Sequence, residues 1–198
     1  MSARERILER VRDALREREP GEHPGAFEGW RPSSSPSPGN PIDLLASMLE
    51  SAGAEVVRLP TEKAATSWIR TLTTEFASVT IGVTVPRALH PPISTRGSHE
   101  AELGVSMARA AIAETGSLLM DARDGRRSQL LAPTHVVIVR AENVHETFLE
   151  ALRSVRDDLP SAIGLHSGPS KSADIAQTLV TGVHGPGRLI AVVIGVGS

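Results

Sequence analysis

The chain begins with a segment in which apolar residues recur at helical spacing. One helical face carries four of them, Ile7, Leu8, Val11 and Leu15. The other positions are mainly Arg and Glu, so the apolar stripe is narrow and the opposite face is solvated. Ser2 and Glu5 have the spacing of a capping box. The pattern predicts an amphipathic helix within residues 1–19, which packs either on its own domain or on a second subunit.

The next segment, residues 20–40, is rich in Pro, Ser and Gly. Proline lacks a backbone N–H, so its concentration in residues 31–41 prevents a regular ladder of hydrogen bonds. The composition predicts a mobile linker between the N-terminal helix and a domain that covers residues 41–198.

From residue 41 onward, helical and strand patterns alternate. Helices are predicted at residues 41–52, 61–76, 144–157 and 172–180. Strands are predicted at residues 54–59, 79–85, 135–139, 162–166 and 189–196. Residues 103–120 are ambiguous, because the Ala-rich part favours a helix and residues 117–120 favour a strand. The alternation predicts an α/β fold with a parallel-rich sheet and helices on both faces, and ligands usually bind at the carboxyl ends of such strands.

Composition argues against nucleic-acid and membrane partners. The formal net charge is -2, and the chain has three Phe, two Trp and no Tyr, which leaves few platforms for base stacking. The longest apolar stretch, residues 189–196, is too short to span a bilayer. Residues 1–19 are charged throughout and lack the apolar core of a signal peptide, so a cytoplasmic location is expected.

The chain contains no cysteine. Disulfides and clusters held by cysteine thiolates are therefore impossible within it. If the protein serves electron transfer, the redox chemistry has to lie in a partner or in a bound small molecule.

Residues 167–175 have the features of an anion site. They follow a predicted strand and open a predicted helix, whose free N–H groups would face a ligand. Gly168 permits a sharp turn, and Ser170 or Ser172 can cap the helix. Lys171 adds a positive charge. The alternative is a well-capped turn without a ligand.

A second candidate is the loop at residues 181–188, which contains three glycines and a proline. His184 lies at its centre and can act as a general acid or base, or as a hydrogen-bond donor, near neutral pH. The alternative is a histidine that only caps the end of the preceding helix. His166, at the end of a predicted strand, is a weaker candidate.

A third candidate is Glu114, which lies beside a Thr-Gly turn in residues 113–117. A carboxylate in this position can be a base or nucleophile if burial raises its pKa. The alternative is a polar turn residue in water.

In this order, the three motifs resemble the LUD-domain family, and within it the lactate-utilisation C-subunit group. They are Ala-Glu-Thr-Gly-Ser at 113–117, Ser-Gly-Pro-Ser-Lys-Ser-Ala-Asp-Ile at 167–175 and Gly-Val-His-Gly-Pro at 182–186. The resemblance extends to the N-terminal helix, the linker and residues 130–133 before a hydrophobic strand. Ser117 and Ser172 stand where the family often has threonine, which keeps the hydroxyl.

The resemblance implies a Rossmann-like three-layer α/β/α sandwich, similar to the fold of the sugar-phosphate isomerase and CoA-transferase group. It also implies a role in the oxidation of L-lactate to pyruvate, together with an iron–sulfur subunit and a Cys-rich subunit. No cofactor and no metal are expected in this chain, because the iron–sulfur clusters would lie in the partner subunits.

On this basis the expected ligand is a small carboxylate or another anion. The residues expected to bind it are Thr115, Gly116, Ser117, Gly168, Pro169, Ser170, Lys171, Ser172, Asp174 and Gly185. The catalytic candidates are His184, which would take a hydroxyl proton, and Glu114, which would line the pocket.

Two other functions remain open. One is a stand-alone transferase or isomerase that acts on a CoA ester or a sugar phosphate, with Glu114 as nucleophile or base. The other is an assembly module without catalysis, in which the N-terminal helix binds the partner.

Overall fold

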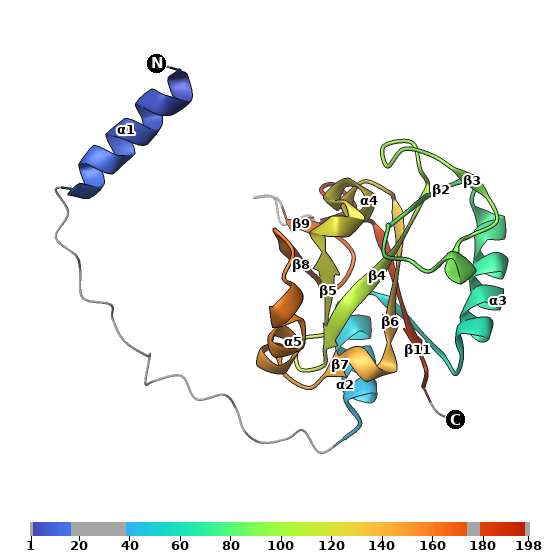
Figure 1. Cartoon of the computed structure of the whole chain (residues 1–198). Coiled ribbons are helices and arrows are strands. Elements are labelled where there is room, and N and C mark those ends of the chain that lie inside the picture. The colour runs from blue at the N-terminus through green and yellow to red at the C-terminus, as the bar shows by residue number, and fades with distance from the viewer. Residues whose placement is uncertain (1, 17–38, 174–178, 197–198) are drawn as a thin grey trace. The chain divides into compact units, whose positions relative to one another are not determined.

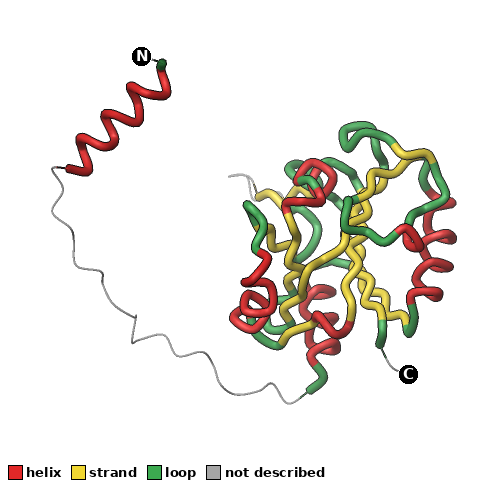
Figure 2. Tube along the Cα trace, in the orientation of Figure 1, coloured by secondary structure: helices red, strands yellow, loops and turns green. Residues whose placement is uncertain are grey.

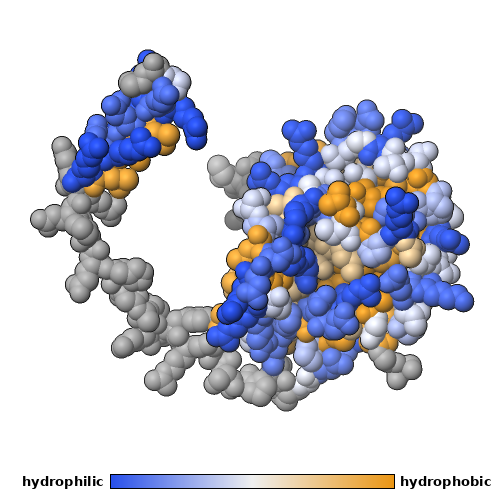
Figure 3. All heavy atoms as spheres, viewed as in Figure 1, coloured by the Kyte–Doolittle hydropathy of each residue, from blue (hydrophilic) through white to orange (hydrophobic). Residues whose placement is uncertain are grey.

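The computed structural model describes residues 2–16, 39–173 and 179–196 (Figure 1). The helix α1 (Ala3–Arg16) belongs to one compact unit, and the residues from Ser37 onward belong to another. The capping box predicted for α1 is present, since Ser2 N donates to Glu5 Oε2 at 2.5 Å and Glu5 N donates to Ser2 Oγ at 3.2 Å. The apolar side chains of α1 form one stripe in Figure 3. Nearly all of the predicted linker lies outside the described residues.

The α/β unit is built on a parallel sheet (Figures 1 and 2). In the described residues its strand order is β1 (Glu55–Leu59), β11 (Arg188–Ile194), β6 (Thr134–Arg140), β4 (Leu103–Ile112), β2 (Ser78–Ile81) and β3 (Ser94–Thr95). Every neighbouring pair in this order is parallel. The apolar runs of β6 and β11 are buried on both faces, which confirms the prediction of central parallel strands.

Strand β4 continues beyond the parallel sheet into a second set of strands. These strands are β5 (Ser117–Asp121), β8 (Ile163–His166) and β7 (Val144–His145). β5 is antiparallel to both β4 and β8, whereas β7 is parallel to β4. The helical alternative for the Ala-rich part of residues 103–120 is wrong. Strands flank this segment on both sides, and the pairing overrides the helical propensity of alanine.

Helices cover both faces of the sheet, as the sequence predicts (Figure 1). They are α2 (Pro41–Ser51), α3 (Glu62–Leu72), α4 (Arg126–Leu130) and α5 (Phe148–Val155). α2 buries Leu45 and Leu49 on one face, and α3 buries Ile69 on the other. α5 covers the antiparallel strands through Ala151 and Val155. In the described residues, no helix is long and apolar enough to cross a membrane.

The remaining elements are short. The 3-10 turns are η1 (Thr73–Glu75), η2 (Arg87–Leu89), η3 (Ala122–Asp124), η4 (Ala141–Asn143) and η5 (Arg156–Asp158). Two further strands, β9 (Lys171–Ala173) and β10 (Leu179–Thr181), form an antiparallel pair of their own. The helix predicted at residues 172–180 is therefore wrong at both of its described ends. The β-branched Val180 and Thr181 favour the strand, and the ladder between β9 and β10 uses their backbone groups.

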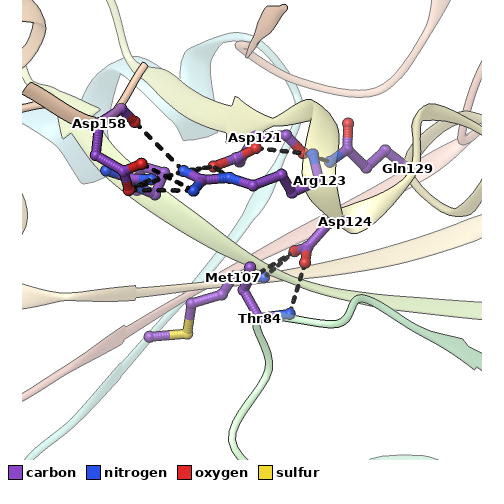
Figure 4. A network of polar contacts seen from close by, with 8 residues as sticks. Thr84, Met107, Asp121, Arg123, Asp124, Gln129 and Asp158 are labelled. Atoms are coloured by element: carbon purple, nitrogen blue, oxygen red, sulfur yellow. Dashed lines mark hydrogen bonds and ion pairs between the residues drawn. The ribbon is translucent and has the colours of Figure 1, made fainter. Parts of the chain in front are cut away.

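A polar network joins β5, η3 and η5 (Figure 4). Asp121 is 1% exposed and accepts hydrogen bonds from Arg123 Nε at 2.8 Å and Arg109 Nη1 at 3.1 Å. Both arginines also contact Asp158. Gln129 Nε2 donates to the Asp121 carbonyl at 2.7 Å. Burial alone would raise the pKa of Asp121, but the hydrogen bonds from Arg123 and Arg109 outweigh it, so this pKa is lowered.

A second buried carboxylate, that of Asp124, joins η3 to the parallel strands (Figure 4). It accepts hydrogen bonds from Thr84 N at 2.7 Å and from Met107 N at 3.3 Å. Gly82 makes room for it, because a Cβ at that position would lie 2.5 Å from the carboxyl group. The segment after β5 is thus fixed against β2 and β4.

We expect Asp121→Asn to destabilise the fold by about 1–3 kcal/mol at neutral pH, because Arg109 and Arg123 each lose one of two anionic partners and keep only the exposed Asp158. A carboxylate with a lowered pKa in the folded state stabilises the protein above its unfolded pKa, and this contribution disappears as the pH falls through the folded pKa. Urea denaturation at neutral pH and at about pH 3 tests both points. The difference between wild type and variant should shrink in acid, and a constant difference would contradict this role.

Candidate functional site

The motif at residues 113–117 and the motif at residues 167–175 meet through their hydroxyl groups. Ser117, at the start of β5, has its Oγ 2.7 Å from Ser167 Oγ, just after β8. Thr115 Oγ1 donates to Ser117 Oγ at 2.8 Å. The hydroxyl at position 117 therefore links the two loops, as either serine or threonine would allow.

The motif at residues 167–175 and the motif at residues 182–186 meet through the backbone. Ser170 N donates to Pro186 O at 2.8 Å, and Gly182 N donates to Ser170 O at 2.9 Å. Gly185 allows the close approach, since a Cβ at that position would lie 3.1 Å from Ser170 Cβ. All three motifs are thus parts of one contiguous region.

The turn at Gly168 packs against the C-terminal end of α2. Gly168 has a φ of +150°, and a Cβ there would lie 3.0 Å from the carbonyl oxygen of Ala52. Lys171 Nζ donates a hydrogen bond to the same carbonyl. A lysine commonly satisfies free carbonyls at a helix C-terminus in this way. Pro169 also lies here, because a Cβ added to Gly53 would be 3.7 Å from Pro169 Cγ.

In residues 167–173, the part of this motif that the structure describes, the expected helix N-terminus is absent. Lys171 and Ser172 belong to β9, so the backbone of this segment pairs with β10 instead of opening a helix. Asp174 lies outside the described residues.

Glu114 is exposed, and its carboxylate caps the start of α5. Its Oε1 accepts a hydrogen bond from Phe148 N at 2.7 Å. Thr147 and Glu150 add a capping box to the same helix end. A carboxylate at this position satisfies free N–H groups of the helix. Glu114 does not line the pocket that contains His184.

His184 lines a pocket of about 480 Å³. The lining residues are Leu130, Leu131, Pro133, Gly182, Val183, His184, Gly185 and Gly187. Pro133 and Gly187 directly precede β6 and β11, so the pocket lies at the amino ends of these parallel strands. This is the edge opposite to the carboxyl ends at which ligands were expected. In Figure 1, α4 and β9 lie at this upper end and β7 at the other.

A buried pair of histidines lies in the same part of the fold. His135 is fully buried at the amino end of β6, and its Nε2 is 3.0 Å from Ser106 Oγ. Its Nδ1 has no hydrogen-bond partner among the residues that the structure describes. The ring of His166 meets it edge-on with 5.9 Å between centroids. Burial, with a smaller contribution from His166, lowers the pKa of His135 to about 3.

Sequence reasoning missed His135, although a histidine inside an otherwise apolar run was a usable signal. The two rings do not belong to a recognisable metal centre. Within residues 2–16, 39–173 and 179–196, no three His, Asp or Glu side chains are grouped so that they could hold a metal ion.

Fold and motif arrangement define a mixed α/β protein whose three characteristic loops contact one another in sequence order, and the last of them lines a pocket. The LUD domain model matches residues 95–194, which include all three motifs, and the chain belongs to this family. It is 36% identical over 124 residues to "Lactate utilization protein C" of Deinococcus radiodurans, covering 59% of this chain and 57% of that protein. It is 35% identical over 107 residues to the protein of the same name from Halalkalibacterium halodurans, covering 49% and 46%.

The chain therefore spans about half the length of the curated relatives it matches. A solved structure supports the fold. The crystal structure of a DUF162 family protein from Deinococcus radiodurans superposes with a TM-score of 0.60 at 19% identity, and covers 78% of this chain and 96% of that one. The parallel-rich α/β fold predicted from the sequence is thus confirmed.

Gly116, in the motif at residues 113–117, has a packing role that can be tested. Gly116 has a φ of +60°, and a Cβ there would lie 2.7 Å from Met48 Cβ in α2. We expect Gly116→Ala to destabilise the fold by about 2 kcal/mol or more, through strain and overpacking. Gly39→Ala is the control, because no atom lies within 4 Å of a Cβ at that position. Equal stability of the two variants in urea denaturation would contradict this role.

Proposed function

We propose that this chain is a non-redox, ligand-binding subunit of a system that oxidises L-lactate to pyruvate. The observation that carries the proposal is the chain of contacts that joins the three motifs, the last of which lines the pocket that contains His184. The similarity to proteins named lactate utilization protein C supplies the metabolic setting. Since the chain matches only about half of each relative, the activity of the assembled system is part of the proposal.

The proposed ligand is a small carboxylate or another anion in the pocket of about 480 Å³. His184 is exposed at its wall, where an imidazole N–H can donate to an oxygen of the ligand. The glycines at 182, 185 and 187 bring backbone groups to the same wall without side chains. Leu130, Leu131 and Val183 supply the apolar part.

Lys171 can contribute positive charge from the neighbouring turn. An ammonium group has three N–H donors, and the Ala52 carbonyl accepts one of them. The remaining donors are available to an anion that binds close to the junction of the second and third motifs.

The redox steps of the proposed system take place in other subunits. A chain without cysteine cannot hold a cluster through thiolates, so the iron–sulfur clusters are placed in an iron–sulfur subunit and a Cys-rich subunit. Helix α1 buries none of its residues in its own unit, and its apolar stripe is available to one of these partners.

A binding screen with matched variants tests the proposal. The panel holds L-lactate, pyruvate, a CoA ester and a sugar phosphate, and thermal shift and calorimetry report binding to the native state. We expect His184→Ala to weaken the binding of lactate or pyruvate by about tenfold or more, because one hydrogen bond to a charged group is lost. His99→Ala is the control, because His99 is exposed and does not line the pocket.

Selective binding of the CoA ester or the sugar phosphate would instead favour a transferase or isomerase. If lactate or pyruvate bound equally well to the two histidine variants, the ligand would not bind in this pocket. Failure of every compound to bind the wild type would contradict the ligand-binding role.

A further inference from the structure

Three hollows meet at helix α4, at the upper end of the α/β unit in Figure 1. One is the pocket of about 480 Å³ that contains His184. The second has a volume of about 290 Å³ and is lined by Arg126, Arg127, Leu130 and Leu131. The third has a volume of about 140 Å³, and its lining includes Arg126 and His166. Leu130 lines all three, so the hollows are parts of one continuous surface.

Three large apolar side chains of this surface are open to solvent. Leu130 is 41% exposed, Leu131 is 51% exposed and Val183 is 55% exposed. The two leucines lie at the C-terminal end of α4, and Val183 lines the larger pocket together with them. A group of exposed apolar side chains that share one surface commonly marks an interaction site on a folded domain.

The charged part of this surface is positive. Arg126 and Arg127 are exposed in the first turn of α4, and neither forms an ion pair with a carboxylate of the described residues. Arg123 differs from them, because Asp121 and Asp158 both hold it. Among the described residues, no Asp or Glu lines any of the three hollows. The surface therefore combines exposed leucines with two positive charges that have no partner in this part of the chain.

The shape of the surface favours a protein partner over a small molecule. The end of α4 forms a ridge between separate hollows, since the exposed Leu130 lines each of them. A small ligand fills one concave pocket and would leave this ridge uncovered. A protein segment can cover the ridge and place side chains in the hollows on either side. Side chains buried in this way supply most of the affinity at protein interfaces.

We infer that this surface binds a protein segment in which bulky apolar side chains are flanked by Asp or Glu. The apolar side chains enter the hollows beside Leu130 and Leu131, and the carboxylates pair with Arg126 and Arg127. The segment belongs to one of the partner subunits, so the inference rests on the proposed function and adds a docking surface to it. The bound segment lies at the rim of the pocket that contains His184, because the two leucines line that pocket as well.

Two other occupants fit this surface less well. A two-fold contact between copies of this chain brings the same patch of both copies together, which would place Arg126 and Arg127 of one copy near those of the other. Like charges brought together in this way oppose association. A bilayer offers no side chains to fill separate hollows, and three exposed apolar side chains supply little area for insertion.

Surface plasmon resonance between the full chain and each purified partner subunit tests the charge recognition. We expect Arg126→Glu/Arg127→Glu to weaken the binding of one subunit by about tenfold or more, because the reversed charges repel its carboxylates. Acidic residues in the first turn of a helix are favoured by the helix dipole, so this variant should fold. The control is Arg87→Glu/Arg96→Glu, which changes the net charge equally at exposed positions that line none of the three hollows. Equal weakening in the two double variants would mean nonspecific attraction and would overturn the inference.

The same assay tests the apolar part of the surface. We expect Leu131→Ser to weaken the binding of the same subunit by about tenfold or more, because an apolar contact at the centre of the interface is lost. Val83→Ser is the matched control, because Val83 is 78% exposed and lines none of the three hollows. If Leu131→Ser bound as tightly as the wild type, the inference would be overturned.

The outcomes separate this inference from the proposed function. If Arg126→Glu/Arg127→Glu bound both subunits as tightly as the wild type while His184→Ala weakened lactate binding, the docking surface would be wrong and the ligand site would stand. If the wild type bound neither subunit, the inference and the partners of the proposed function would both be wrong. The lactate binding screen would then decide on the ligand site by itself.

Two further measurements test the other occupants. Sedimentation of the chain with phosphatidylglycerol vesicles tests a bilayer, and analytical ultracentrifugation of the chain alone tests a second copy. We expect no co-sedimentation and no dimer that depends on this surface. Co-sedimentation, or a dimer, that Arg126→Glu/Arg127→Glu abolishes would overturn the inference, because the surface would then serve a different occupant.

Discussion

One strand, β4, belongs to two sheets at once, and the rest of the α/β unit depends on it. Its first half pairs with β2 and β6, and its second half pairs with β5 and β7. The change occurs at a register shift between Ala108 and Ala110, which is typical of a β-bulge. Near the start of the same strand, Gly104 allows α4 to pack closely, because a Cβ at that position would lie 2.8 Å from Ser128 O. Larger residues there would push α4 away from the sheet.

This geometry explains where the motif loops lie. Because β5 is antiparallel to both β4 and β8, the turns at Ser117 and Ser167 come together near the end of α2. The hairpin of β9 and β10 then leads the chain back to the amino end of β11. Much of what looks like site chemistry in the motifs is packing, since Gly116, Gly168 and Gly185 each allow a close approach between segments. The open pockets lie next to these contacts, around α4 and the loop that contains His184.

The sequence predicted the fold class and most elements well, because the apolar runs at 135–139 and 189–196 and the capped helices carry strong local signals. It failed where tertiary pairing decides the structure. The Ala-rich half of β4 is a strand only because its neighbours pair with it, and β9 is a strand only because β10 returns beside it. The role of Glu114 could not be predicted either, since its partner Phe148 is 34 residues away. The pocket at Arg126 and His166 has no sequence motif, as it forms between segments distant in the chain.

The central claim is that ligands bind at the amino ends of the parallel strands, around α4 and the His184 loop. Backbone amide NMR spectra recorded during a titration with L-lactate and pyruvate test it most directly. The account predicts that the shifted amides cluster in residues 126–133, 164–168 and 182–187. Shifts that cluster at the opposite edge, around Gly82, Arg140 and Gly195, would contradict it, because those residues lie at or directly after the carboxyl ends of β2, β6 and β11.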